Sequence, residues 1–259
     1  MFEYPVKGLR GNRICCASVN SRGLKMDRRW MIVNSANSFL SQRTLPQMTQ
    51  FQPIFQDQLV IRDLEESLET KAAPEDFIDE VEVEVWGQVV SARQAPRELN
   101  DWLSARLDQP VKLVYMADND IRPVRNGTAG DIVSFADGYP VLLTATASLE
   151  MLNSKLEDKI TIDRFRPNIH VTTSRAFEED EWQKIKIGDT VFRVAKRSAR
   201  CQVINVNQVT GKATKEPLQA LSTFRNVDNH VYFGVNLIPE SFGIIHEGDQ
   251  LEVLAKVSS

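Results

Sequence analysis

Cys201 is the residue whose type and neighbours best suit chemistry in this chain. It follows Arg200 directly, and the only other cysteines are the adjacent pair Cys15 and Cys16. A lone thiol cannot supply the ligand set of a zinc site. It can act as a nucleophile, or give one thiolate to a metal that a cofactor otherwise holds. Arg200 favours the thiolate that both roles need, whereas an inert core cysteine is the competing interpretation.

Basic residues precede this cysteine and are the first sign of a binding cavity. The nearest series is Arg193, Lys196, Arg197 and Arg200. If these side chains face the same cavity as the thiol, they stabilise its anionic form. Further upstream, Arg164, Arg166 and Asn168 are spaced by two residues, which places all three on one face of an extended segment. Such a face could grip a phosphate or a polar ring, although a solvated basic strand has the same pattern.

Other candidate residues give weaker signals when taken singly. Lys7 and Arg28 lie near the beginnings of early β-prone runs, and Asp27 beside Arg28 equally fits a surface ion pair. Asp137 opens the turn signature Asp137-Gly138-Tyr139-Pro140, where a carboxylate beside a catalytic metal would also make sense. The histidines at 170, 230 and 246 lack metal-ligand spacing and are interpreted as structural or surface residues.

Composition and motifs exclude several function classes. The net charge of -4 leaves no basic surplus for nucleic acid, and no apolar run suggests a membrane partner. Walker, dinucleotide-glycine, HExxH and GxSxG signatures are absent from the sequence. Residues 1–7 do not begin a signal peptide, and three cysteines suit a reducing compartment, so we expect a cytoplasmic location.

The elements that must position these residues are mostly strands. Before residue 115 the β-prone runs are 14–19, 29–33 and 81–85. The last run alternates with period two, so its carboxylates should face water. The charged stretch 57–73 is interpreted as a loop or an edge hairpin. Pro96 should open a helix whose apolar residues at helical spacing are Leu99, Trp102, Leu103 and Leu107.

After residue 115 the pattern predicts more strands and two short helices. Ser148 is expected to cap a helix with an apolar face of Met151, Leu152 and Leu156. Residues 169–173 should form a strand and residues 217–224 a helix. Gly188-Asp189 predicts a hairpin turn, and Gly248-Asp249 predicts the same turn again before 251–254. Together these elements predict a barrel-like α+β fold.

An ordered set of short segments resembles the MOSC-domain family preceded by its usual N-terminal β-barrel domain. Within that family it is similar to the bacterial MOSC reductases of N-hydroxylated compounds and to the mitochondrial amidoxime-reducing component. The segments span nearly the whole chain, and their order makes the match specific. They are Tyr4–Gly8, Gly23–Trp30, Gln42-Arg43, Phe135–Pro140, Arg164–Ile169, Glu179–Trp182, Ile187–Asp189, Arg200-Cys201, Gly211 and Glu216–Leu218.

The resemblance implies a fold and a cofactor. The fold is α+β and β-rich, with an N-terminal β-barrel-like domain at 1–114 packed on a C-terminal MOSC β-barrel domain at 115–259 that has a few short helices. The cofactor is the molybdenum cofactor (molybdopterin). Cys201 matches its metal ligand, and Asp137 matches a carboxylate close to the metal. The positions that would hold its phosphate and pterin are Lys7, Arg28, Arg166, Asn168 and Arg200.

The resemblance also implies an activity. A molybdenum-dependent oxidoreductase would reduce an N-hydroxylated small molecule (an amidoxime or N-hydroxy base), an N-oxide or a sulfoxide by two electrons. No cysteines remain for a ferredoxin domain, so a separate donor protein of ferredoxin or flavin reductase type is expected. The alternative is a non-enzymatic cofactor carrier or sulfur-transfer module. A cysteine-nucleophile hydrolase would need a nearby histidine. Many relatives carry Ser at the position of Gly8, which removes one hydroxyl contact here.

Overall fold

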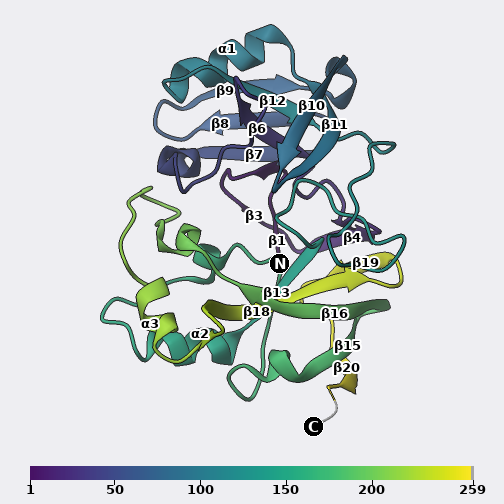
Figure 1. Cartoon of the computed structure of the whole chain (residues 1–259), viewed down its shortest axis with the longest axis vertical. Helices are drawn as coiled ribbons and strands as arrows, with labels where there is room; N and C mark the ends of the chain where they lie inside the picture. Colours follow the sequence, from purple (N-terminus) through teal and green to yellow (C-terminus); the bar gives the residue numbers. More distant parts are fainter. Residues whose placement is uncertain (258–259) are drawn as a thin grey trace.

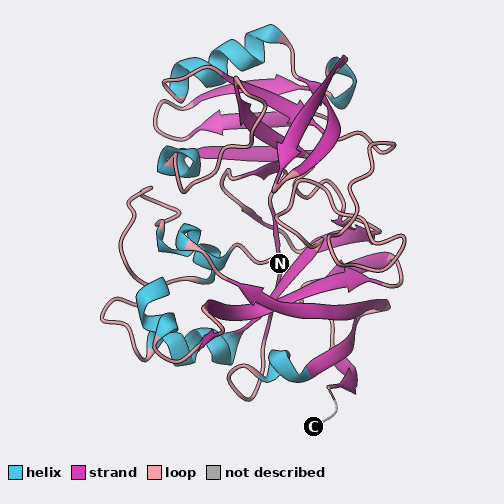
Figure 2. Ribbon diagram, viewed as in Figure 1, coloured by secondary structure: helices cyan, strands magenta, loops and turns pink. Residues whose placement is uncertain are grey.

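Two β-rich lobes make up residues 1–257, the part of the chain that the computed structural model describes (Figure 1). Strands dominate both lobes, and the three α-helices of these residues are short (Figure 2). The predicted α+β, β-rich class, with a barrel-like N-terminal domain packed on a second β domain, is therefore confirmed. Within residues 1–257, no helix has both the length and the apolar character that a membrane crossing needs.

The first lobe occupies the upper half of Figure 1 and combines a five-stranded sheet with a three-stranded one. The larger sheet has the order β10-β11-β12-β6-β2, and the smaller one β7-β8-β9. The elements are β2 (Val6–Lys7), β6 (Trp30–Asn34), β7 (Phe51–Phe55), β8 (Leu59–Asp63), β9 (Leu68–Ala72), β10 (Asp79–Val85), β11 (Gln88–Gln94), α1 (Arg97–Arg106) and β12 (Val111–Tyr115), with 3-10 helices η1 (Pro46–Gln50) and η2 (Pro74–Asp76).

Strand β6 shows why this lobe forms a double-sided sheet. Trp30 and Ile32 point into one hydrophobic cluster, and Met31 and Val33 point into another on the opposite face. Because successive side chains alternate between faces, a continuous apolar run is the pattern of a strand buried on both sides. Of the two alternatives for 57–73, a loop or an edge hairpin, the structure has the hairpin β8–β9, and the helix after Pro96 is confirmed as α1.

The second lobe is built on a seven-stranded sheet with the order β14-β13-β18-β16-β15-β20, from which β17 pairs with β18. The long strands β16 and β18 cross its middle (Figure 1). The elements are β13 (Val141–Ala145), α2 (Thr146–Asn153), β14 (Ile169–Val171), β15 (Trp182–Ile187), β16 (Thr190–Ala199), α3 (Leu218–Ser222), β17 (Asn226–Val227), β18 (His230–Pro239), β19 (Gly243–His246) and β20 (Leu251–Lys256), with 3-10 helices η3 (Ile162–Phe165), η4 (Glu178–Glu181) and η5 (Gln202–Asn205).

Three local predictions for this lobe are wrong. Ser148 does not cap a helix but lies inside α2, where its buried hydroxyl donates to the Glu179 carboxylate; Ala145 is the N-cap residue. Met151, expected on the apolar face, is exposed. The turn at Gly188-Asp189 does join paired strands. Strands β19 and β20, on either side of Gly248-Asp249, instead pair with β4 (Cys16–Asn20) and β15, not with each other. Tertiary partners outweighed the local turn signal.

The first 24 residues run along the junction between the two lobes. They contain β1 (Phe2–Glu3), β3 (Asn12–Arg13), β4 (Cys16–Asn20) and β5 (Gly23–Leu24). Strand β4 pairs with β19 of the second lobe, beside which it lies in Figure 1. Gly23 has φ +91°, and a Cβ there would lie 2.6 Å from the carbonyl oxygen of Pro140, so only glycine allows this approach. The division of domains at residue 114 stays a prediction.

Candidate functional site

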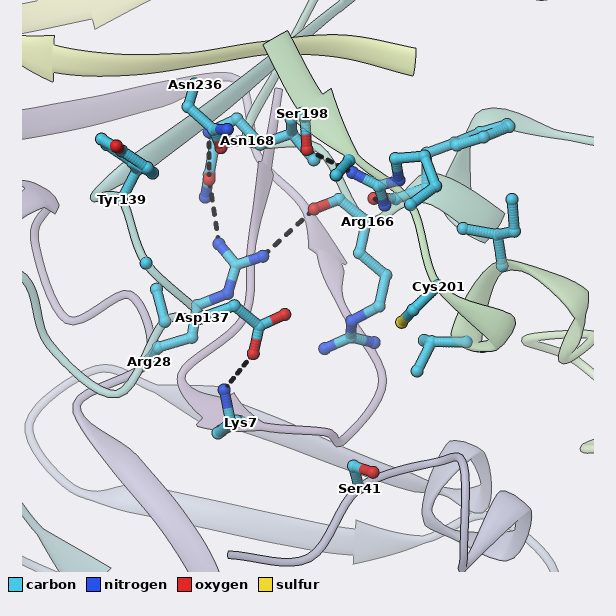
Figure 3. A pocket seen from close by; sticks show the side chains of 18 of the residues that line it. Lys7, Arg28, Ser41, Asp137, Tyr139, Arg166, Asn168, Ser198, Cys201 and Asn236 are labelled. Atoms are coloured by element: carbon cyan, nitrogen blue, oxygen red, sulfur yellow. Dashed lines mark hydrogen bonds and ion pairs between the residues drawn. The ribbon is translucent and has the colours of Figure 1, made fainter. Parts of the chain in front are cut away.

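A cavity of about 280 Å³ opens at the junction of the two lobes. The N-terminal side contributes Lys7, Gly8, Arg28, Ser41 and Gln42. The C-terminal side contributes the 136–139 loop, the Phe165–Asn168 region and the end of β16 through Cys201. All of the residues proposed from the sequence as cofactor or metal ligands therefore line one cavity, although nearly 200 positions separate the first from the last. Figure 3 shows most of them.

Cys201 lies just beyond the end of β16. Two register irregularities interrupt the pairing of β16 with β18, one between Val194 and Lys196 and one between Arg197 and Ala199. Irregularities of this kind bend a strand and re-aim its side chains. Cys201 is exposed and lines the cavity, where Figure 3 shows its sulfur. The competing interpretation of a core cysteine therefore does not hold.

The alternation of β16 decides which of its basic residues reach the cavity. Lys196 and Ser198 of β16, and Arg200 just beyond its end, line the cavity. Arg193 points elsewhere and pairs with Asp131 at 2.7 Å, while Arg197 lies over the Tyr232 ring. Neither Arg193 nor Arg197 is among the lining residues, so the expectation of a single basic series around the thiol is corrected. Successive residues of a strand face opposite sides.

Arg166 reaches the cavity by a route that the sequence did not indicate. The segment before it is the 3-10 helix η3, and Arg166 itself is left-handed with φ 55°, so the predicted extended segment is wrong. Arg164 consequently turns away and donates to the carbonyl oxygen of Ile204 at 3.3 Å. Arg166 and Asn168 do both line the cavity. A turn, not a strand, brings them together.

The Arg166 guanidinium is only lightly engaged by the protein. Its Nη1 donates to Gln208 at 3.3 Å, and the group lies over the Tyr4 ring at 4.4 Å. Within the described residues, Nε and Nη2 have no acceptor. Burial lowers the pKa of Arg166 to about 10, so the group remains charged at neutral pH. It is free to bind an anion in the cavity.

Arg28 makes three hydrogen bonds to the protein, and it links the lobes. Its Nη1 donates to Asp27 at 2.5 Å and to Asn168 at 2.9 Å, and its Nη2 donates to the carbonyl oxygen of Arg166 at 3.1 Å. Asp27 is buried and also accepts from the backbone N–H of Tyr4. The surface ion pair suggested by the sequence is thus a buried one.

Arg200 forms part of the opposite wall. Its Nη2 donates to the carbonyl oxygen of Phe165 at 2.7 Å, and its Nη1 donates to the Ser198 hydroxyl at 3.0 Å. Its Nε is buried and has no partner in the described part of the chain. Burial lowers the pKa of Arg200, and the neighbouring Cys201 sulfur acts in the opposite direction. The guanidinium and thiol are therefore electrostatic neighbours.

Lys7 and Asp137 form an ion pair across the junction. The buried Lys7 ammonium donates to Asp137 at 2.5 Å and to the carbonyl oxygen of Phe135 at 2.8 Å. Asp137 faces the open cavity, with 75% of its side-chain surface accessible. Enclosure in the cleft alone would raise the pKa of its carboxyl, but the Lys7 ammonium and an N–H of Trp86 hold that pKa well below its ordinary value. Asp137 is therefore a carboxylate at neutral pH.

Several residues of the site were not predicted as binding residues from the sequence. Tyr4 carries both the Arg28 and the Arg166 guanidinium groups over its ring, at 4.1 and 4.4 Å. Gln42 and Gln208 exchange amide hydrogen bonds across the junction, and Gln208 also accepts from Arg166. Only Ser198 could have been found, because it alternates with Lys196 and Arg200.

The histidines lie outside this arrangement. None of the three lines the cavity; His170 instead bonds to the hydroxyls of Thr144 and Thr146. No group of three or more His, Cys, Asp or Glu residues within 1–257 could hold a metal ion unaided. A cysteine-histidine hydrolase and a protein-only metal centre are both disfavoured.

Comparisons with known proteins match the chain in two consecutive parts. A family model described as the MOSC N-terminal beta barrel domain matches residues 1–110, and one described as the MOSC domain matches residues 130–252. Mitochondrial amidoxime-reducing component 1 of Xenopus laevis is 29% identical over 96% of this chain and 79% of that protein. The human protein of the same name is 28% identical over 99% of this chain and 82% of that protein.

A second kind of relative is larger. Molybdenum cofactor sulfurase of Oryza sativa subsp. japonica is 27% identical over 90% of this chain but only 31% of that protein. The chain therefore spans about a third of the length of that relative. The similarity covers both lobes described above.

Proposed function

The chain belongs to the MOSC family, with an N-terminal MOSC β-barrel domain followed by a MOSC domain, and we propose that it is a molybdenum-dependent oxidoreductase. It would reduce N-hydroxylated compounds such as amidoximes and N-hydroxy bases, or the related N-oxides or sulfoxides. One observation carries the proposal: the exposed thiol of Cys201 shares a cavity with five cationic side chains and a single carboxylate. The cations are Lys7, Arg28, Arg166, Lys196 and Arg200.

The residues of the cavity fit the molybdenum cofactor. Soft thiolate ligands suit a metal already held by a dithiolene, which supports Cys201 as the metal ligand. Guanidinium forks suit phosphate and fused polar rings, and two nitrogens of Arg166 have no acceptor in the described residues. We assign the phosphate and pterin to Lys7, Arg28, Arg166, Asn168 and Arg200. When bound, the cofactor would supply the two-electron redox chemistry.

The protein's own groups would orient the substrate and the cofactor. Reduction of an N–OH group to N–H consumes two electrons and two protons and releases water. Asp137, held ionised by Lys7, would accept a hydrogen bond from an N–H or O–H of the substrate. The electrons would come from a separate donor protein of ferredoxin or flavin reductase type. A cytoplasmic location, without nucleic-acid or membrane partners, completes the proposal and rests on the sequence alone.

The test is metal content followed by turnover. The protein is expressed in a host that makes the cofactor, molybdenum per chain is measured by mass spectrometry, and an amidoxime is offered with a chemical electron donor. We expect near-stoichiometric molybdenum and formation of the amidine. Cys201→Ser should lose both, while the matched control Cys16→Ser, also exposed but outside the cavity, should keep both. Fully loaded protein without turnover contradicts the reductase.

A second candidate function is a cofactor carrier or sulfur-transfer module. The match over 90% of this chain to about a third of a molybdenum cofactor sulfurase favours it. In that case Cys201 would hold the cofactor or sulfur without reducing a substrate. Loaded protein that restores activity to a cofactor-free molybdoenzyme, yet reduces no amidoxime or N-oxide, would support the carrier over the reductase.

A further inference from the structure

Trp86 stands at the tip of the β10–β11 hairpin in an unusual conformation. Val85 pairs with Gln88, so Trp86 and Gly87 alone make the turn, with φ angles of 53° and 75°. A two-residue turn with both φ positive favours Asn followed by Gly. A bulky side chain with positive φ is an outlier. Trp86 is also 40% exposed, so core burial does not explain its presence.

The indole of Trp86 instead reaches across the junction to the site. Its Nε1–H donates to Oδ1 of Asp137 at 3.0 Å. The ring is held by Phe39, with centroids 5.1 Å apart, and by the Arg43 guanidinium at 4.8 Å. The carbonyl oxygen of Trp86 accepts from Arg125 at 2.8 Å, which fixes the turn itself. The indole is therefore a fixed donor aimed at one carboxylate oxygen.

The same Asp137 oxygen receives both donors of the N-terminal lobe. Lys7 and Trp86 both donate to Oδ1, and Oδ2 has no hydrogen-bond partner among the described residues. The second oxygen points toward the centre of the cavity (Figure 3). Arg122 holds the backbone that carries the Asp137 side chain, because it donates to the carbonyl oxygens of Ala136 and Asp137. Oδ1 of Asp137 therefore accepts both hydrogen bonds, and Oδ2 is left without a protein donor in the described residues.

We propose that Trp86 is a positioning residue that holds Asp137 with Oδ2 presented to an N–H or O–H donor of the substrate. This rests on the proposed reductase function. Lys7 alone could hold the charge of the carboxylate, but a second donor at a different angle fixes its rotation. The strained turn residue and the oriented carboxylate thus have one explanation. Substrates able to donate a hydrogen bond, such as amidoximes, would depend on Trp86 more than N-oxides, which have no such hydrogen.

The contact itself is tested first, without cofactor. In the ¹⁵N-labelled full-length protein, the indole N–H signal lost in Trp86→Phe identifies Trp86 among the four tryptophans. In Asp137→Ala this signal should move upfield, as expected for loss of a carboxylate acceptor. The signal assigned by Trp102→Phe, from a tryptophan on α1, should stay in place. An unmoved Trp86 signal overturns the inference whatever the protein's activity.

The second test is a double-mutant cycle on the loaded enzyme. Trp86→Phe keeps a ring between Phe39 and Arg43 but removes the N–H. It should lower kcat/KM for an amidoxime about tenfold, the factor that one hydrogen bond to a charged group is worth. Molybdenum content should be unchanged. In the Asp137→Ala background the same change should have less than about a twofold effect, because coupled residues are not additive.

The remaining outcomes separate the two proposals. Trp86→Asn, which suits the turn better, should lose as much amidoxime activity as Trp86→Phe, and both should reduce an N-oxide nearly as fast as wild type. Additive losses in the cycle, or full activity of Trp86→Asn, overturn the positioning role. Loaded wild-type protein that reduces nothing, with the indole signal still sensitive to Asp137→Ala, overturns the reductase and leaves the contact established. Trp102→Phe serves again as the matched control.

Discussion

The two walls of the cavity differ in how their positive charge is balanced. On the N-terminal wall (Lys7 and Arg28), each cation pairs with a protein carboxylate, Asp137 or Asp27, at 2.5 Å. On the C-terminal wall (Arg166, Lys196 and Arg200), no cation has a carboxylate within ion-pair distance in residues 1–257. Its hydrogen bonds go to amide, hydroxyl and carbonyl oxygens instead.

This difference indicates two uses of the same residue type. Folding itself supplies the counter-charges of the N-terminal wall, so those cations also hold the lobes together, in addition to the cofactor contacts proposed for them. The C-terminal wall keeps an uncompensated positive charge beside Cys201, and an anionic ligand gains most from such a charge because no protein partner has to be displaced. Substitutions in the N-terminal wall should therefore lower stability, and substitutions in the C-terminal wall should weaken ligand binding.

The largest expected effect is on stability and is confined to the N-terminal wall. Arg28→Met leaves the buried Asp27 carboxylate without its cation, and breaking a buried pair in this way should lower the free energy of unfolding by about 3 kcal/mol. Arg166→Met, on the C-terminal wall, should change it by less than about 1 kcal/mol. Urea unfolding of both variants measures the contrast. Equal losses would break the distinction between the walls.

The next effect is on cofactor retention and belongs to the C-terminal wall. Arg166→Met should weaken retention of the cofactor about tenfold, since one charge-assisted hydrogen bond contributes about 1.5–3 kcal/mol. Molybdenum per chain after extended dialysis is the measurement. Arg175→Met, which removes an exposed arginine paired with Glu181, is the control. If Arg166→Met retained as much molybdenum as the wild type, the anionic group of the cofactor would not bind at Arg166.

A smaller effect is expected at Gly8, where the resemblance to the family leads us to expect serine. Gly8 has φ +85°, and a Cβ would lie 2.7 Å from the Met48 Cε. Gly8→Ser should therefore lower the free energy of unfolding by about 1–2 kcal/mol, the cost of a left-handed non-glycine residue. It should not raise molybdenum content. Gly8→Ala is the matched control; a stable Gly8→Ser that retains more metal would show that the hydroxyl contact can be restored.

The smallest effect concerns pH and sharpens the description of the N-terminal wall. The folded pKa of Asp137 lies below its ordinary value of 3.8, so its pair with Lys7 contributes stability above that pH and loses it as the pH falls. Asp137→Asn should flatten the decline of unfolding free energy below about pH 4. Asp118→Asn, which removes the exposed partner of Arg29, should leave the slope unchanged. If the unfolding free energy of Asp137→Asn fell with pH in parallel to that of the wild type, the stabilising role of the Lys7–Asp137 pair would be contradicted.

The strands show how far local pattern was sufficient. The apolar run at Trp30 to Val33 and the alternation at Val81 to Val85 both became the predicted strands. Side-chain period and apolar content are local properties, so a sequence states them directly. The left-handed turn at Arg166 and the interior position of Ser148 were not predicted, because each is settled by contacts with distant segments.

The sequence by itself determined that the chain is β-rich and which residue types were available: one isolated thiol, several arginines and a carboxylate in a turn. Only the tertiary structure decided which of them meet. Arg166, Arg200 and Lys7 converge on the cavity, while Arg164 and Arg193 face away, and Trp86 joins Asp137 from the other lobe. The physical reason is that strand irregularities, positive φ angles and packing between the lobes set the direction of a side chain, and spacing along the chain does not encode them.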